Sequence, residues 1–189
     1  MKERLVGFAC AALVLVATAP AAFAQQRPVP DRGMGAIGLN AGVAMPSEEA
    51  LNPGWFLAVN GEGYLTPRFS IRAQLGGAWW DVEGNALDGK VSPMHLTGDG
   101  VYNWERGKWH PYVSAGVGWY RFRFGEGDNR VKDSKVGANI GGGIEYFFTR
   151  SDTLTGDLTI HFVPGTMDSA IFGYKARYWT LAGGYKKYF

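Results

Sequence analysis

Eight segments of the chain alternate between apolar residues and polar or small residues. Alternation with a period of two places one set of side chains on each face of a β-strand, so each segment predicts a strand with one apolar face. Strands of roughly ten residues are long enough to cross the hydrocarbon layer of a membrane when they are tilted. The segments cover residues 34–43, 55–65, 69–80, 93–104, 109–124, 134–148, 153–163 and 174–189.

The connections between these segments alternate between long and short. Residues 44–54, 81–92, 125–133 and 164–173 form the long connections, and residues 66–68, 105–108 and 149–152 form the short ones. If the strands run up and down in order, all short turns and both ends of the strand region lie on one side. Such asymmetry is typical of barrels that cross a bacterial outer membrane, with the short turns in the periplasm.

The last strand ends on an aromatic residue. Trp179, Leu181, Gly183, Tyr185 and Phe189 share its apolar face. A closed barrel needs a closing strand because an open sheet edge cannot survive in lipid. This ending resembles the C-terminal signal that outer-membrane barrels present to their insertion machinery, which implies that Tyr185 and Phe189 serve as assembly residues. Lys187 departs from that pattern, which usually has an apolar or aromatic residue there. An ordinary final strand of a soluble barrel is the alternative.

The other end of the chain predicts secretion. Lys2 and Arg4 precede an apolar run over residues 5–17, and a small-x-small cleavage site ends at Ala24. This pattern indicates a cleaved signal peptide, with an uncleaved membrane anchor as the alternative. Cys10 lies within the signal, so the mature chain has no cysteine and no disulfide. We therefore divide the chain into a signal peptide (1–24), an extended periplasmic leader (25–33) and a barrel domain (34–189).

The whole mature chain resembles the small OmpA/OmpX-like outer-membrane barrels. The resemblance implies an all-β fold, an eight-stranded antiparallel up-and-down transmembrane β-barrel in the cell outer membrane. It also implies contact with outer-membrane lipid and lipopolysaccharide, with periplasmic chaperones and with the barrel insertion machinery. We expect a monomer without a cofactor, and the nearly balanced net charge of +2 does not suggest a nucleic-acid partner.

A soluble lipocalin-like barrel would show the same alternation with its faces exchanged. Two features favour the membrane version. The polar face is rich in glycine and charge, as a narrow interior requires. Aromatic residues also gather near strand ends, where they would form girdles at the two membrane interfaces. They are Trp55, Trp79, Trp80, Tyr102, Trp104, Trp119, Tyr146, Phe148, Tyr185 and Phe189.

The inward face carries the candidate site. If the second and third segments pair about Pro67, Glu62 faces Arg72 inside the barrel, and the fourth segment brings Asp99 beside Arg72. The remaining interior charged residues are Glu145, Asp157, His161 and Lys186. Four acids then outnumber two cations, so we expect one carboxyl to hold a proton or His161 to carry a charge. We interpret the network as a structural plug, with an ion pathway as the alternative.

Enzymatic chemistry has weaker support. Some outer-membrane barrels are lipid A deacylases that use a His-x-Ser pair, but His161 is followed by Phe162 and Val163, and His95 has only Thr97 in that place. No catalytic or metal-binding residues are therefore predicted. The leading function is a structural or surface-interaction barrel. A narrow, low-conductance pore is the first alternative, and a lipid A-modifying enzyme is the second.

A last expectation concerns lipid at the outer rim. Arg121, Arg123 and Arg177 fall where strands become loops, at the level of lipid A phosphates, and guanidinium matches phosphate in geometry and charge. We hypothesise that they seat the barrel among these phosphates, with solvated loop charges as the alternative. The stretch 121–124 (RFRF) reverses the apolar parity of its strand, which predicts a bulge or the point where the strand leaves the apolar layer.

Overall fold

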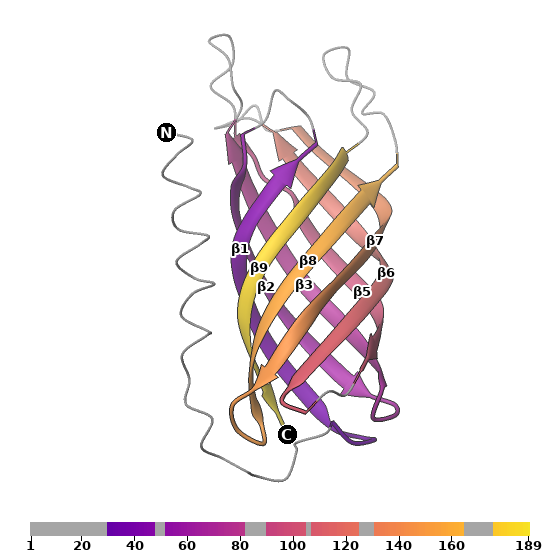
Figure 1. Cartoon of the computed structure of the whole chain (residues 1–189). Coiled ribbons are helices and arrows are strands. Elements are labelled where there is room, and N and C mark those ends of the chain that lie inside the picture. Colours follow the sequence, from indigo (N-terminus) through magenta and orange to yellow (C-terminus); the bar gives the residue numbers. More distant parts are fainter. Residues whose placement is uncertain (1–29, 48–51, 82–89, 105–106, 125–130, 165–175) are drawn as a thin grey trace.

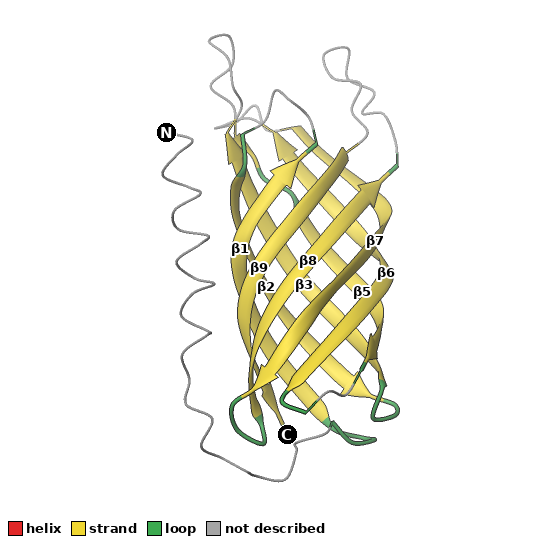
Figure 2. Ribbon diagram, in the orientation of Figure 1, coloured by secondary structure: helices red, strands yellow, loops and turns green. Residues whose placement is uncertain are grey.

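The computed structural model describes residues 30–47, 52–81, 90–104, 107–124, 131–164 and 176–189, which form one antiparallel sheet closed into a barrel (Figure 1, Figure 2). The predicted signal peptide lies outside these residues. Among them, no helix is long and apolar enough to cross a membrane. Pairing of the first strand with the last closes the ring. The strands are β1 (Gly35–Pro46), β2 (Gly54–Tyr64), β3 (Phe69–Asp81), β4 (Lys90–Val91), β5 (Met94–Asn103), β6 (Trp109–Phe124), β7 (Val131–Phe147), β8 (Asp152–Val163) and β9 (Ala176–Tyr188).

Strands β4 and β5 are two parts of one crossing strand. Trp80 pairs with Val91 and Gly77 pairs with Met94, so both parts keep the same register against β3. Pro93 lies between them and has no N–H to donate, which interrupts the ladder. Its carbonyl still accepts a hydrogen bond from the Ala78 N–H at 3.0 Å. The barrel therefore has the eight crossing strands that the sequence predicts.

The barrel has an apolar outer wall and a polar interior. Along β2, Leu57 and Val59 are exposed on the outside, while the side chains of Phe56, Ala58 and Asn60 are buried inside. The same alternation buries charged residues and exposes large apolar ones on the other strands. A soluble barrel would have the opposite arrangement, so the two faces favour a barrel that lies in lipid.

Most of the predicted girdle residues lie on this outer wall, but Trp80 does not. Its side chain is only 3% exposed and packs edge-to-face against Tyr178, with ring centroids 5.2 Å apart. Neighbouring residues of a strand point to opposite faces, so Trp79 takes the outward position and Trp80 the inward one. The assignment of Trp80 to a girdle is therefore wrong.

Strands β6 and β7 form a long hairpin with a regular register. Pairing continues without an offset from Trp109 opposite Tyr146 to Phe124 opposite Val131, so the bulge predicted in this stretch is wrong. Tyr120 and Phe122 are buried inside the barrel, and Arg121 and Arg123 take the outward positions between and after them. The apparent reversal arises because the interior itself becomes aromatic near this end.

Residues 30–33 are held against the barrel end that carries the short turns and the C-terminus (Figure 1). Pro30 is fully buried, and the Gly33 N–H donates to the Tyr64 carbonyl at 2.8 Å. Gly33 has a φ of 85°, a left-handed conformation that glycine adopts without steric cost. This part of the expected leader is therefore fixed in place and not free, while residues 25–29 lie outside the described residues.

Candidate functional site

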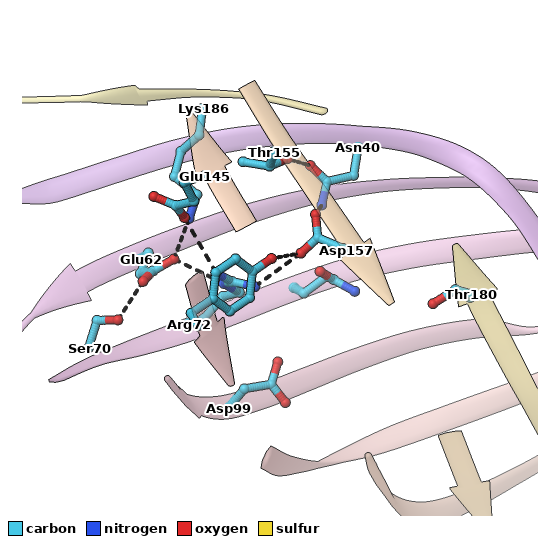
Figure 3. Close-up of polar contacts among 12 residues, drawn as sticks. Asn40, Glu62, Ser70, Arg72, Asp99, Glu145, Thr155, Asp157, Thr180 and Lys186 are labelled. Atoms are coloured by element: carbon cyan, nitrogen blue, oxygen red, sulfur yellow. Dashed lines mark hydrogen bonds and ion pairs between the residues drawn. The ribbon is translucent and has the colours of Figure 1, made fainter. Parts of the chain in front are cut away.

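A buried network of ion pairs lies inside the half of the barrel nearest the short turns. Figure 3 shows its polar contacts. Glu62 on β2 accepts hydrogen bonds from the Arg72 Nε at 3.0 Å and from the Lys186 Nζ at 2.8 Å. It also accepts a hydrogen bond from the Ser70 hydroxyl. Glu62 and Arg72 face each other across β2 and β3, in the register expected from the sequence, whereas Lys186 comes from β9 near the other end of the chain.

Glu145 on β7 is the second carboxylate of the network. It accepts hydrogen bonds from the Lys186 Nζ and from the Tyr188 hydroxyl, and its Oε1 lies 4.0 Å from the Arg72 Nη2. Glu145 and Lys186 are only 1% and 2% exposed, so their charges have almost no contact with solvent. Charges this deeply buried depend on one another, because solvent cannot replace a missing partner.

Asp157 on β8 completes the network on the far side of Arg72. Its Oδ1 lies 3.6 Å from the Arg72 Nη1 and accepts a hydrogen bond from the Tyr112 hydroxyl. The guanidinium of Arg72 also lies 4.8 Å from the centre of the Tyr112 ring. Asn40 donates to Asp157 at 3.1 Å and accepts a hydrogen bond from Thr155 at 3.4 Å, which ties β1 to β8.

The network contains two cations, Arg72 and Lys186, and three carboxylates, Glu62, Glu145 and Asp157. Serine and tyrosine hydroxyls donate to all three carboxylates, which helps to distribute the remaining negative charge. The five residues lie on β2, β3, β7, β8 and β9, so their ion pairs connect strands that are not all neighbours in the sheet.

Two residues that the sequence grouped with this network lie apart from it. The backbone of Asp99 is opposite Arg72, but its carboxylate accepts a hydrogen bond from Thr97 at 3.1 Å and forms no ion pair with another described residue (Figure 3). His161 lies nearer the other end of the barrel. Its Nδ1 is 3.0 Å from the Tyr120 hydroxyl oxygen, and its Nε2 is 3.4 Å from that of Thr180.

A layer of rings fills the half of the barrel away from the short turns. The imidazoles of His95 and His161 have centroids 4.9 Å apart, and His161 stacks on Tyr178 at 4.4 Å. The Tyr178 hydroxyl oxygen lies 3.2 Å from the His95 Nδ1. The largest apolar side chains of this layer are Phe56, Trp80, Tyr120, Phe122 and Tyr178. We did not predict this ring layer, although the alternation along the strands places these residues on the inward face.

The three rim arginines lie on the outer wall. The Arg177 guanidinium is 5.2 Å from the centre of the Phe162 ring and 5.7 Å from that of Trp179. Arg121 and Arg123 are half-buried on β6. The Nε of Arg123 is buried and has no hydrogen-bond partner among the described residues. A guanidinium in such a position can donate hydrogen bonds to an anionic partner from outside the chain.

A protein-family model described as the outer membrane protein beta-barrel domain matches residues 8–186. The chain belongs to the outer membrane protein β-barrel domain family. Its place is therefore the cell outer membrane. A search of curated proteins found no match.

Solved structures of other outer-membrane barrels share the fold. Neisserial surface protein A has a TM-score of 0.67 and 14% sequence identity, with 82% of this chain and 99% of that chain covered. The attachment invasion locus protein Ail of Yersinia pestis has a TM-score of 0.57 and 14% identity, with coverages of 84% and 99%. The N-terminal β-barrel domain of Pseudomonas aeruginosa OprF has a TM-score of 0.54 and 18% identity, with coverages of 84% and 100%. At these identities the likeness concerns the fold alone.

Membership of this family indicates which end of the barrel faces the periplasm and which faces the outside of the cell. Outer-membrane barrels have short turns in the periplasm and longer loops outside the cell. In this outer-membrane barrel, the ion-pair network therefore lies in the periplasmic half and the ring layer lies in the outer half. Residues 30–33 cover part of the periplasmic end, and the rim arginines lie toward the outer leaflet.

The closing strand joins the barrel at its periplasmic end. Phe189 and Gly35 exchange two backbone hydrogen bonds, of 2.9 Å and 3.0 Å. The side chains of Tyr185 and Phe189 are on the outer wall, and the Tyr185 hydroxyl donates to Asp152. Both side chains therefore face the membrane rather than the core.

The histidines are placed for packing. His161 is 0% exposed and His95 is 2% exposed, so a lipid in the membrane does not reach either imidazole in this conformation. The ring of His110 contacts that of Phe147 near the periplasmic end, with its Nε2 3.1 Å from the Gly107 carbonyl oxygen. Among the described residues, no group of three or more His, Cys, Asp or Glu side chains could hold a metal ion.

Proposed function

We propose that this outer-membrane barrel is a sealed structural or surface-interaction barrel, which anchors itself in the membrane and presents its loops outside the cell. The observation that carries the proposal is the ring layer, a buried group of aromatic side chains across the outer half of the interior. Eight strands enclose a space that side chains can just fill. A narrow pore needs a continuous polar path, and the ring layer supports a sealed interior instead.

Conductance in planar bilayers tests the sealed interior. The wild-type protein should show no steady conductance, because the ring layer excludes water and ions. A Tyr120→Ala/Tyr178→Ala double variant should show discrete openings, because it removes two fully buried rings from that layer. The matched control is Val117→Ala, on the outer wall.

Steady conductance of the wild-type protein, unchanged in the double variant, would support the pore instead. The lipid A-modifying alternative predicts an altered lipid A mass after overexpression. We expect an unchanged mass, since the buried histidines are separated from lipid.

We also propose that Arg121, Arg123 and Arg177 contact lipopolysaccharide phosphates. Their positions on the outer wall, at the end away from the periplasmic turns, support this contact. Long basic side chains can lie along apolar surface while their charged ends reach phosphate. Arg177, which lies across two aromatic rings, has this arrangement.

Thermal unfolding in vesicles with and without lipopolysaccharide tests the three arginines together. Lipopolysaccharide should raise the unfolding temperature of the wild type by several degrees, and the gain should be smaller in a triple Arg→Gln variant because phosphate loses its charged donors. Arg68→Gln, in a periplasmic turn, is the control and should keep the full gain. An equal gain in the triple variant and the wild type would reject the contact.

A further inference from the structure

A groove crosses the outer wall of the barrel beside Arg123. It has a volume of about 580 Å³ and runs over β2 and β3 to the start of β5. Its side chains are mainly apolar and include Leu57, Leu75, Trp79 and Met94. The groove lies toward the outer leaflet, because Trp79 is near the outer end of β3.

Gly77, which has no side chain, is part of the lining of the groove. In the register of the sheet, Gly77 lies between Leu57 and Met94, and all three residues belong to the lining of the groove. A Cβ atom at position 77 would meet only ordinary contacts, 3.7 Å from the Pro93 carbonyl oxygen and 3.7 Å from the Trp79 Cη2. A first side-chain carbon therefore fits at position 77 beside the Trp79 ring, and a longer side chain would extend into the groove.

Arg123 gives one end of the groove a positive charge. Its backbone exchanges hydrogen bonds of 3.0 Å and 3.2 Å with Ser92, which places its side chain beside the groove rather than in a free loop. A buried guanidinium N–H without an acceptor costs free energy, and the Nε of Arg123 is such a group among the described residues. Phosphate is a strong acceptor for guanidinium, and it can accept two N–H groups at once.

We propose that this groove binds lipid A, with one acyl chain over Gly77 and a phosphate on Arg123. An apolar hollow joined to a cationic end matches a molecule in which an acyl chain and a phosphate are close together. The groove lies near the outer rim, at the level of the outer leaflet, and lipid A is the phosphorylated lipid of that leaflet. The inference rests on the proposed lipopolysaccharide contact of the rim arginines and adds a seat for an acyl chain, which depends on Gly77.

Titration of the folded, full-length mature protein in detergent micelles with purified lipid A tests the seat. Gly77→Leu fills the hollow and should weaken binding by about tenfold, since an acyl chain loses several buried methylene contacts. Gly98→Leu is the matched control. Gly98 is also an outward glycine, and a Cβ atom there would have nothing within 4 Å, but it lies outside the groove. This control should bind lipid A as the wild type does.

Further variants separate the two parts of the seat. Arg123→Gln should weaken binding of lipid A but leave binding of dephosphorylated lipid A unchanged. Leu75→Trp fills the hollow from its wall and replaces Gly77→Leu if that variant does not fold, as checked by heat-modifiable migration on gels.

Equal affinity of lipid A for the wild type and both filled variants would overturn the acyl-chain seat, even if the arginine contact holds. In that case the triple Arg→Gln variant would still lose its stabilisation by lipopolysaccharide, while the two filled variants would keep it. Phosphatidylglycerol that binds as tightly as lipid A would overturn the choice of lipid A.

Discussion

Replacing Glu62 with Ala should destabilise the folded barrel by roughly 3–5 kcal/mol, the usual cost of breaking a buried ion pair. Glu62 accepts hydrogen bonds from both cations of the network, Arg72 and Lys186, and all three side chains are almost completely buried. Without this carboxylate, two buried charges lose an acceptor that water cannot replace. Equilibrium unfolding in denaturant, with the protein in lipid vesicles, measures the change.

The double variant Glu62→Ala/Arg72→Ala should recover only part of this loss. Removing Arg72 eliminates one of the two cations that lose Glu62, and Lys186 keeps Glu145 as its partner. The recovery is incomplete because Asp157 then loses its own ion pair with Arg72. Asp99→Asn is the matched control, because Asp99 is also buried but has no ion pair among the described residues, so its stability should stay near that of the wild type. A Glu62→Ala variant as stable as the wild type would show that the network does not stabilise the barrel.

Changing the C-terminal aromatic residues should nearly abolish the assembled protein in the outer membrane. Deletion of Phe189, or replacement of Tyr185 and Phe189 by Asp, removes one or both lipid-facing aromatic residues at the periplasmic end of the closing strand. The barrel is then left open to periplasmic proteolysis. Phe189 also pairs with Gly35 through two backbone hydrogen bonds, so its deletion shortens the joint that closes the ring. Heat-modifiable migration of the protein from the outer-membrane fraction measures assembly.

Lys187→Asp is the control for added charge on the same face. Lys187 is exposed on β9 and pairs with Asp152 at 2.9 Å, an exposed contact of little energetic value. This variant should assemble at close to wild-type levels. Normal levels of the Tyr185→Asp/Phe189→Asp variant would show that the closing strand does not need its aromatic residues.

The sequence predicted the barrel well because a single geometric rule governs most of it. Period-two alternation assigns each side chain to a face, and the turn at Pro67 sets the register that brings Glu62 opposite Arg72. The rule was misapplied where both faces carried aromatic residues. The girdle assignment of Trp80 followed its residue type, whereas continued alternation turns this side chain inward.

The candidate site was harder to predict because its contacts depend on the length of each side chain as well as on the face of the strand that carries it. Lys186 joins Glu62 and Glu145 across the barrel, so a long flexible side chain selects partners that no strand pairing specifies. Asp99 shows the converse, since its backbone is opposite Arg72 but its shorter side chain bonds to Thr97. The groove at Gly77 could not be inferred from the pattern, because an outward glycine alone does not reveal whether its neighbours leave a hollow.

The side-chain contacts between β2 and β9 also bear on the order of events during folding. Glu62 and Lys186 are 124 residues apart in the chain, and so are Tyr64 and Tyr188, whose hydroxyls lie 3.0 Å apart. Such contacts form only after a long loop of chain has been closed, which makes them late in any pathway that builds the sheet strand by strand. Interactions that are absent from the transition state slow unfolding without speeding folding. We therefore expect the contacts between β2 and β9 to slow unfolding of the finished barrel more than they speed its folding.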